Sequence, residues 1–129
     1  MSDAPTKNGV LSYGGSSRLS RVVNNFVHDM CTGVWFASLL VIWVVASRSA
    51  GVSVEAREVL VDAQRAVFWL LVTALLGLAV TGGLRLMYWR QDTPLDDLSA
   101  KRGSLLVKHV AFLLVYGIGT ALAALVVFR

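Results

Sequence analysis

Three apolar stretches, each about 25 residues long, dominate this chain and limit what it can fold into. They cover about residues 22–47, 65–89 and 104–128. A helix of about 20 residues crosses the hydrocarbon core of a bilayer, which is roughly 30 Å thick. Because lipid offers no hydrogen-bond partner to an open strand, each stretch is predicted to be an α-helix. The expected fold is therefore an all-α membrane protein with three transmembrane helices.

The composition excludes several other classes of protein. Hydrophobic residues make up 56% of the 129 residues and charged residues only 16%, whereas a soluble domain carries about 25% charged residues. A chain this short has too much surface for its volume to bury so many apolar side chains. The single cysteine, Cys31, cannot form an internal disulfide. A soluble enzyme, a disordered chain and a disulfide scaffold are thus excluded.

The N-terminal segment is polar. Residues 1–20 are rich in Ser and Gly and show no apolar period, which predicts a polar tail ahead of a transmembrane domain over residues 21–129. The first apolar stretch that follows is too long for the apolar region of a cleavable signal peptide.

The links between the spans are short. Within residues 48–64, the segment 54–61 is expected either to form a short interfacial helix or to extend the second span. Within residues 90–103, Asp92 and Pro94 are expected to end the second helix. Short links make neighbouring spans antiparallel, which predicts a three-helix up-down-up bundle.

Basic residues predict the orientation of these spans. The net charge is +4, and the basic residues flank the apolar stretches instead of forming a patch, so no nucleic-acid partner is expected. The richer side should be cytoplasmic, which places the N-terminus inside, in a bacterial inner (cytoplasmic) membrane. That side holds Lys7, Arg18, Arg21, Arg85, Arg90, Lys101, Arg102 and Lys108, and the other side holds Arg48, Arg57, Arg65 and Arg129.

Both histidines of the chain, His28 and His109, lie inside predicted spans, where an ionisable side chain suggests a function. His28 follows Arg21 by seven residues, and His109 follows Arg102 by seven. At 1.5 Å per residue, each imidazole sits roughly 10 Å below its own basic flank. Since the first and third spans run in the same direction, the two rings are predicted to meet at one level. Asp29 is a candidate to accept a hydrogen bond from a ligating imidazole.

The second span lacks bulk at about the same level. Counting seven residues back from Arg90 reaches Gly83, beside Gly82. Such glycines allow the close approach of a helix or of a flat ligand. A porphyrin is a flat ligand whose iron accepts two axial imidazoles, so haem b is the expected cofactor. Its propionates need cations near that membrane surface, and the candidates are Arg85, Arg90, Lys101, Arg102 and Lys108.

These features also have simpler explanations. An intramembrane histidine often bonds a neighbouring helix, and a Gly-Gly pair is often a packing notch. The tryptophans fit interface belts and packing. The pairs of small residues four apart, which predict helix contacts, are Gly33 with Ala37, Ala79 with Gly83, and Gly119 with Ala123.

Copper is an alternative metal for the same region. His28, Met30 and Cys31 lie within one turn, and Met87 approaches from the second span. Imidazole, thioether and thiolate together suit Cu(I). Against this, consecutive helical residues point about 100° apart, so the three donors of the first span cannot all face one ion.

Three short segments carry a resemblance to a known family. They are residues 28–35 (HDMCTGVW) in the first span, 81–83 (TGG) at the end of the second, and 103–108 (GSLLVK) at the start of the third. In these segments the chain resembles the copper-resistance D (CopD-like) membrane family and its small relatives, over roughly residues 24–120. Full-length members have more spans, so the chain is similar to a single unit of that architecture. The resemblance implies copper handling. Because some relatives bind haem b through intramembrane histidines, it also implies haem ligation by His28 and His109.

We therefore expect a haem b-binding electron-transfer subunit of a larger respiratory or redox complex. The axial ligands are His28 and His109, and the other cofactor-binding residues are Gly82, Gly83, Arg85 and Lys108. No catalytic residues are predicted, because the chain shows no phosphate loop, nucleophile triad or paired catalytic carboxylates. The expected partners are the lipid bilayer, other subunits of the complex and a quinone. A CopD-like copper transport or homeostasis protein, and a membrane anchor without a cofactor, are the two alternatives.

Overall fold

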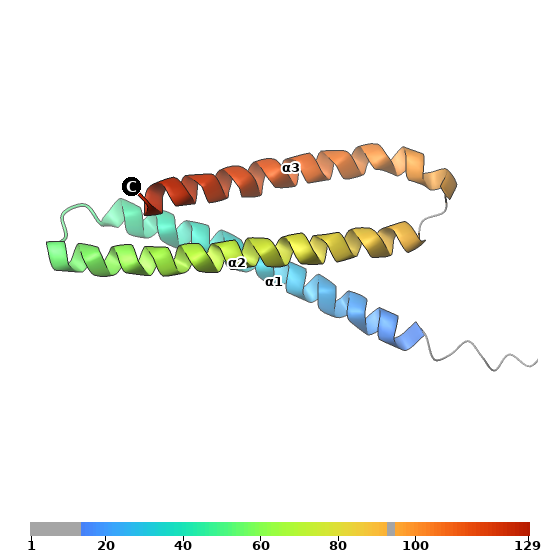
Figure 1. Cartoon of the computed structure of the whole chain (residues 1–129), viewed down its shortest axis with the longest axis horizontal. Coiled ribbons are helices and arrows are strands. Elements are labelled where there is room, and N and C mark those ends of the chain that lie inside the picture. Colours follow the sequence, from blue (N-terminus) through green and yellow to red (C-terminus); the bar gives the residue numbers. More distant parts are fainter. Residues whose placement is uncertain (1–13, 93–94) are drawn as a thin grey trace, which may run out of the picture.

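The computed structural model describes the backbone of residues 14–92 and 95–129 and the side chains of residues 18–88 and 103–129. These residues form three helices: α1 (Gly14–Arg48), α2 (Val54–Asp92) and α3 (Leu95–Val127) (Figure 1). Each helix contains a segment long and apolar enough to cross a membrane, namely Arg18–Arg48, Val54–Tyr88 and Gly103–Val127. The prediction of an all-α membrane protein with three transmembrane helices is confirmed.

The three helices differ in how closely they pack. Figure 1 shows consecutive helices running in opposite directions, with α1 crossing α2 and diverging from it toward the N-terminal end of α1. The contacts between α1 and α2 are the most extensive, and α3 contacts both of them less. Near its C-terminal end, α3 approaches the second half of α1 (Figure 1).

The helices extend beyond the apolar stretches that predicted them. Residues 14–20 belong to α1, although we expected them to be tail, and residues 1–13 lie outside the described part of the chain. The segment 54–61 extends the second span, which was one of the two alternatives. Only the part of a helix that lies in lipid must be apolar. The helix itself continues until a capping residue or a helix breaker ends its backbone hydrogen bonding.

The ends of α2 illustrate this. Ser53 caps its first turn, because the Ala56 backbone N–H donates to the Ser53 hydroxyl oxygen at 3.3 Å. Gly51, in the turn before it, has a φ of 90°, which a side chain would strain. The last residue of α2 is Asp92, as predicted, and Pro94 lies outside the described residues. Much of the link predicted over residues 90–103 is helical, since α3 begins at Leu95.

Close packing joins α3 to α1 through Trp35, which is 1% exposed. The Trp35 indole N–H donates to the Thr120 hydroxyl at 3.2 Å, and the ring centroids of Trp35 and Tyr116 are 4.6 Å apart. A Cβ added at Gly119 would lie 2.5 Å from the Trp35 ring, so only glycine allows this approach. Ala123, one turn further along α3, is 2% exposed. The second half of α3 is therefore the half that is anchored in the bundle.

Candidate functional site

The first half of α3 leaves a cavity between itself and the other two helices. Its volume is about 570 Å³, within the range of about 300–1,000 Å³ that is typical of sites for small molecules and cofactors. Most of its wall is apolar, and four polar side chains enter it from all three helices. The residues that line it are His28, Leu78, Ala79, Gly82, Gly83, Arg85, Leu86, Leu105, Lys108, His109, Phe112 and Leu113.

All six residues predicted to bind a cofactor line this one cavity. His28 comes from α1, Gly82, Gly83 and Arg85 come from α2, and Lys108 and His109 come from α3. The spacing along the sequence predicted two imidazoles at the same level beside the glycines, and the fold places all four residues around a common space. That this space takes a haem stays a prediction.

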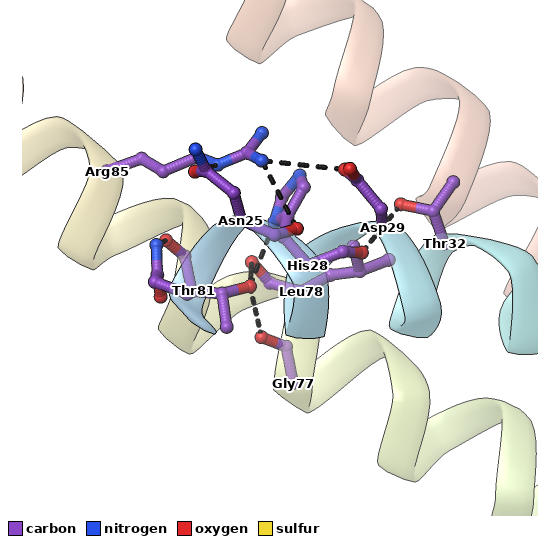
Figure 2. Close-up of polar contacts among 9 residues, drawn as sticks. Asn25, His28, Asp29, Thr32, Gly77, Leu78, Thr81 and Arg85 are labelled. Carbon is purple, nitrogen blue, oxygen red and sulfur yellow. Dashed lines mark hydrogen bonds and ion pairs between the residues drawn. The ribbon is translucent and has the colours of Figure 1, made fainter. Parts of the chain in front are cut away.

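The imidazole of His28 is held by Thr81 of α2. The His28 Nδ1 and the Thr81 Oγ1 are 2.8 Å apart, and the Thr81 hydroxyl donates to the Gly77 carbonyl at 2.7 Å (Figure 2). Because a hydroxyl has one hydrogen and a carbonyl can only accept it, the Thr81 oxygen must accept the Nδ1–H of His28. The proton of neutral His28 is therefore on Nδ1, and Nε2 keeps its lone pair.

His109 has the same tautomer for a different reason. Its Nδ1 is 2.7 Å from the backbone carbonyl oxygen of Leu105, one turn earlier on α3. Since that oxygen only accepts, Nδ1 carries the proton here too. Within the described part of the chain, neither Nε2 has a hydrogen-bond partner. The cavity thus contains two imidazoles that each present a lone pair.

The two cationic side chains of the cavity differ in whether they already have polar partners. Arg85 reaches from α2 to α1, where its Nε donates to the Asn25 Oδ1 at 2.8 Å and its Nη2 lies 3.5 Å from the Asp29 Oδ1 (Figure 2). Lys108 is exposed and has no ion-pair partner among the described residues. Lys108 is therefore the cation that is free to bind an anion, whereas Arg85 already joins two helices.

Two residues that were not predicted to bind a cofactor hold this level of the bundle together. Asn24 is 7% exposed, and its amide nitrogen donates to the Thr81 carbonyl at 3.1 Å. Thr81, which is 6% exposed, also bonds His28, in the role that we had considered for Asp29. Both residues can be recognised in the sequence as polar residues inside apolar spans. Their pairing cannot, because it depends on how α1 crosses α2.

The four residues of the alternative copper set have different surroundings. Cys31 faces α2, where a Cβ added at Gly77 would lie 2.6 Å from its Sγ. Met30 is 53% exposed and lines a second cavity of about 390 Å³ on α1, and Met87 is 58% exposed. His28 alone of the four lines the first cavity. No group of three or more His, Cys, Asp or Glu residues within the described ranges is placed to hold a metal ion.

Comparison of the chain with protein-family models, with curated proteins and with solved structures finds no match. The assignment of a function therefore depends on the chemistry of the cavity.

Proposed function

We propose that this protein is a haem b-binding electron-transfer subunit of a larger respiratory or redox complex. One observation carries the proposal: two imidazoles on separate helices, His28 and His109, line one apolar cavity, and each has an engaged Nδ1 and a free Nε2. A haem iron takes two axial imidazoles. A hydrogen bond on the far ring nitrogen orients such a ligand and raises its basicity.

The wall of the cavity fits a flat, mostly apolar ligand. Nothing lies within 4 Å of a Cβ added at Gly83, and at Gly82 the nearest atom is the His28 Cε1 at 3.8 Å. The face of α2 at Gly82 and Gly83 is therefore free of bulk where it lines the cavity. Phe112 and the leucines make most of the wall apolar, and Lys108 offers a positive charge for a propionate.

The cellular setting is part of the same proposal. A bundle with a single cofactor has no site at which to oxidise a substrate, so it needs partner subunits that deliver and remove electrons, with the quinone pool as one acceptor. The excess of basic residues near the start of α1 and α3 supports an N-terminus on the cytoplasmic side of a bacterial inner membrane, with α1, α2 and α3 crossing up, down and up.

The test is an absorption spectrum of the purified full chain, oxidised and reduced, together with its metal content. We expect a reduced α-band and one haem per chain. His28→Ala and His109→Ala should each lose the spectrum of the wild-type protein, whereas the control Met87→Ala should keep it because Met87 lies outside the cavity. An unchanged spectrum in either histidine variant would overturn the proposal. Stoichiometric copper without a haem spectrum would replace it with the copper alternative.

A further inference from the structure

We infer that Thr81 is a positioning residue that fixes His28 in the Nδ1–H form and so presents its Nε2 to the cavity as a metal ligand. This inference deepens the proposed function, because it says how one of the two imidazoles is prepared for a metal. The Thr81 hydroxyl itself does not bind the metal.

The hydroxyl of Thr81 can act only as an acceptor toward His28. Besides the Gly77 carbonyl oxygen at 2.7 Å, the Leu78 carbonyl oxygen lies 3.3 Å from the Thr81 Oγ1. Both carbonyls belong to the preceding turn of α2 and compete for the single hydroxyl hydrogen. If the hydroxyl instead donated to His28, its oxygen would face a carbonyl oxygen at 2.7 Å with no hydrogen between them. The carbonyl groups of α2 thus determine that Thr81 accepts and His28 donates in the hydrogen bond between α2 and α1.

The position of the hydroxyl is itself fixed. The buried Asn24 donates to the Thr81 backbone carbonyl at 3.1 Å, which joins α1 to α2 one turn before His28. On the other side of the ring, Arg85 bonds Asn25 and pairs with Asp29 (Figure 2). Contacts between the same two helices therefore flank His28 and keep its ring opposite Thr81.

The two histidines are not equivalent in this respect. His109 donates to a backbone carbonyl of its own helix, which no side-chain substitution removes. His28 depends on a side chain from a neighbouring helix, so its tautomer can be changed by one substitution at Thr81. His109 is therefore an internal control for any measurement on His28.

Nitrogen NMR of the full chain, labelled with ¹⁵N-histidine and held in detergent micelles, tests the inference without any haem. At a pH high enough to keep both imidazoles neutral, the shifts separate protonated from bare ring nitrogens. We expect wild type to carry the proton on Nδ1 at both histidines. Thr81→Val, which keeps the shape and removes the hydroxyl, should shift His28 toward the Nε2–H form and leave His109 unchanged. Thr81→Ser should restore the wild-type pattern.

Two results would overturn the inference: a proton on Nε2 of His28 in wild type, or a His28 signal that is the same in Thr81→Val as in wild type. If Thr81→Val disturbs the fold, the backbone amide signals of α1 and α2 change along their length, and Thr81→Ser then decides. A failure of Thr81→Ser to give the Nδ1–H form would count against the role of the hydroxyl.

A haem titration of the same variants separates this inference from the proposed function. Loss of a hydrogen bond to a metal-ligating histidine typically weakens metal binding by about 10–100-fold, so Thr81→Val should show a loss in this range and Thr81→Ser a smaller one. If wild type binds no haem, the proposed function fails, and the nitrogen spectrum still decides the role of Thr81.

Discussion

At the scale of single residues, ligand binding in the cavity depends on a glycine that leaves space in the wall and on a charged side chain that has no partner. Gly83 adds no bulk to the wall, and Lys108 brings a positive charge that no described residue neutralises. Each of these properties can be removed by one substitution, and each has a counterpart elsewhere in the chain that provides a control.

Filling the wall at Gly83 should block the cavity. In Gly83→Leu the new side chain enters space that is empty within 4 Å of its Cβ. We expect haem binding to weaken about tenfold or more, a loss of about 1.4 kcal/mol, because the leucine side chain would occupy space that the ligand needs. The control is Gly33→Leu, because Gly33 is equally open but lies outside this cavity. Equal affinities of the two variants in a spectrophotometric titration would contradict the assignment of the site.

Neutralising Lys108 should weaken the binding of an anionic ligand without loosening the bundle. Lys108→Gln is expected to lower haem affinity about 2–5-fold, the size of an exposed charge interaction. Its thermal unfolding should match that of wild type, because Lys108 has no partner to lose among the described residues. As a matched control, Arg65→Gln removes an exposed cation that pairs with Asp62 away from the cavity. A larger effect at Arg65 than at Lys108 would count against a propionate contact.

At the scale of the helices, α3 is anchored at one half and stands apart at the other. Its second half meets Trp35 through Tyr116, Gly119 and Thr120, while its first half lines the cavity. The cavity therefore exists because the close contact between α1 and α3 is confined to one end. Substitutions at the anchored end should affect stability, and those at the open end should affect binding.

Gly119→Ala tests the anchored end. The new methyl group would lie 2.5 Å from the rigid Trp35 ring, so α3 must move or the ring must rotate. We expect a loss of about 1–3 kcal/mol in the free energy of unfolding, as for other overpacked cores. Gly117→Ala, with nothing within 4 Å of its Cβ, should be neutral or gain up to about 1 kcal/mol from helix propensity. Denaturant unfolding in detergent that failed to separate the two variants would contradict this packing.

At the scale of the whole molecule, the sequence predicted what lipid and helix geometry enforce. The three spans were recognisable because their apolar length matches a bilayer. The pairing of His28 with His109 around one cavity was foreseeable because their depths follow from the rise per residue. Apart from Asp92 at the end of α2, the helix ends were not foreseeable, because capping by Ser53 and continuation through polar residues do not depend on an apolar stretch.

The role of Thr81 was also beyond the sequence, for a different reason. Its hydroxyl reaches His28 only because α1 crosses α2 at this level, and a crossing angle depends on how side chains such as Trp35, Leu71 and Leu78 fill the core. The depth of a residue in a span can be counted along the chain. Which neighbour it faces requires the packed structure.

We propose that two imidazoles from different helices, His28 and His109, hold one iron. Electron paramagnetic resonance of the oxidised, purified protein tests this ligation, because the spin state reports the number of strong axial ligands. We expect a low-spin signal in wild type that converts to high spin, or disappears with the haem, in both His28→Ala and His109→Ala. A wild-type protein without haem, or a low-spin signal that persists when either histidine is removed, would contradict the claim.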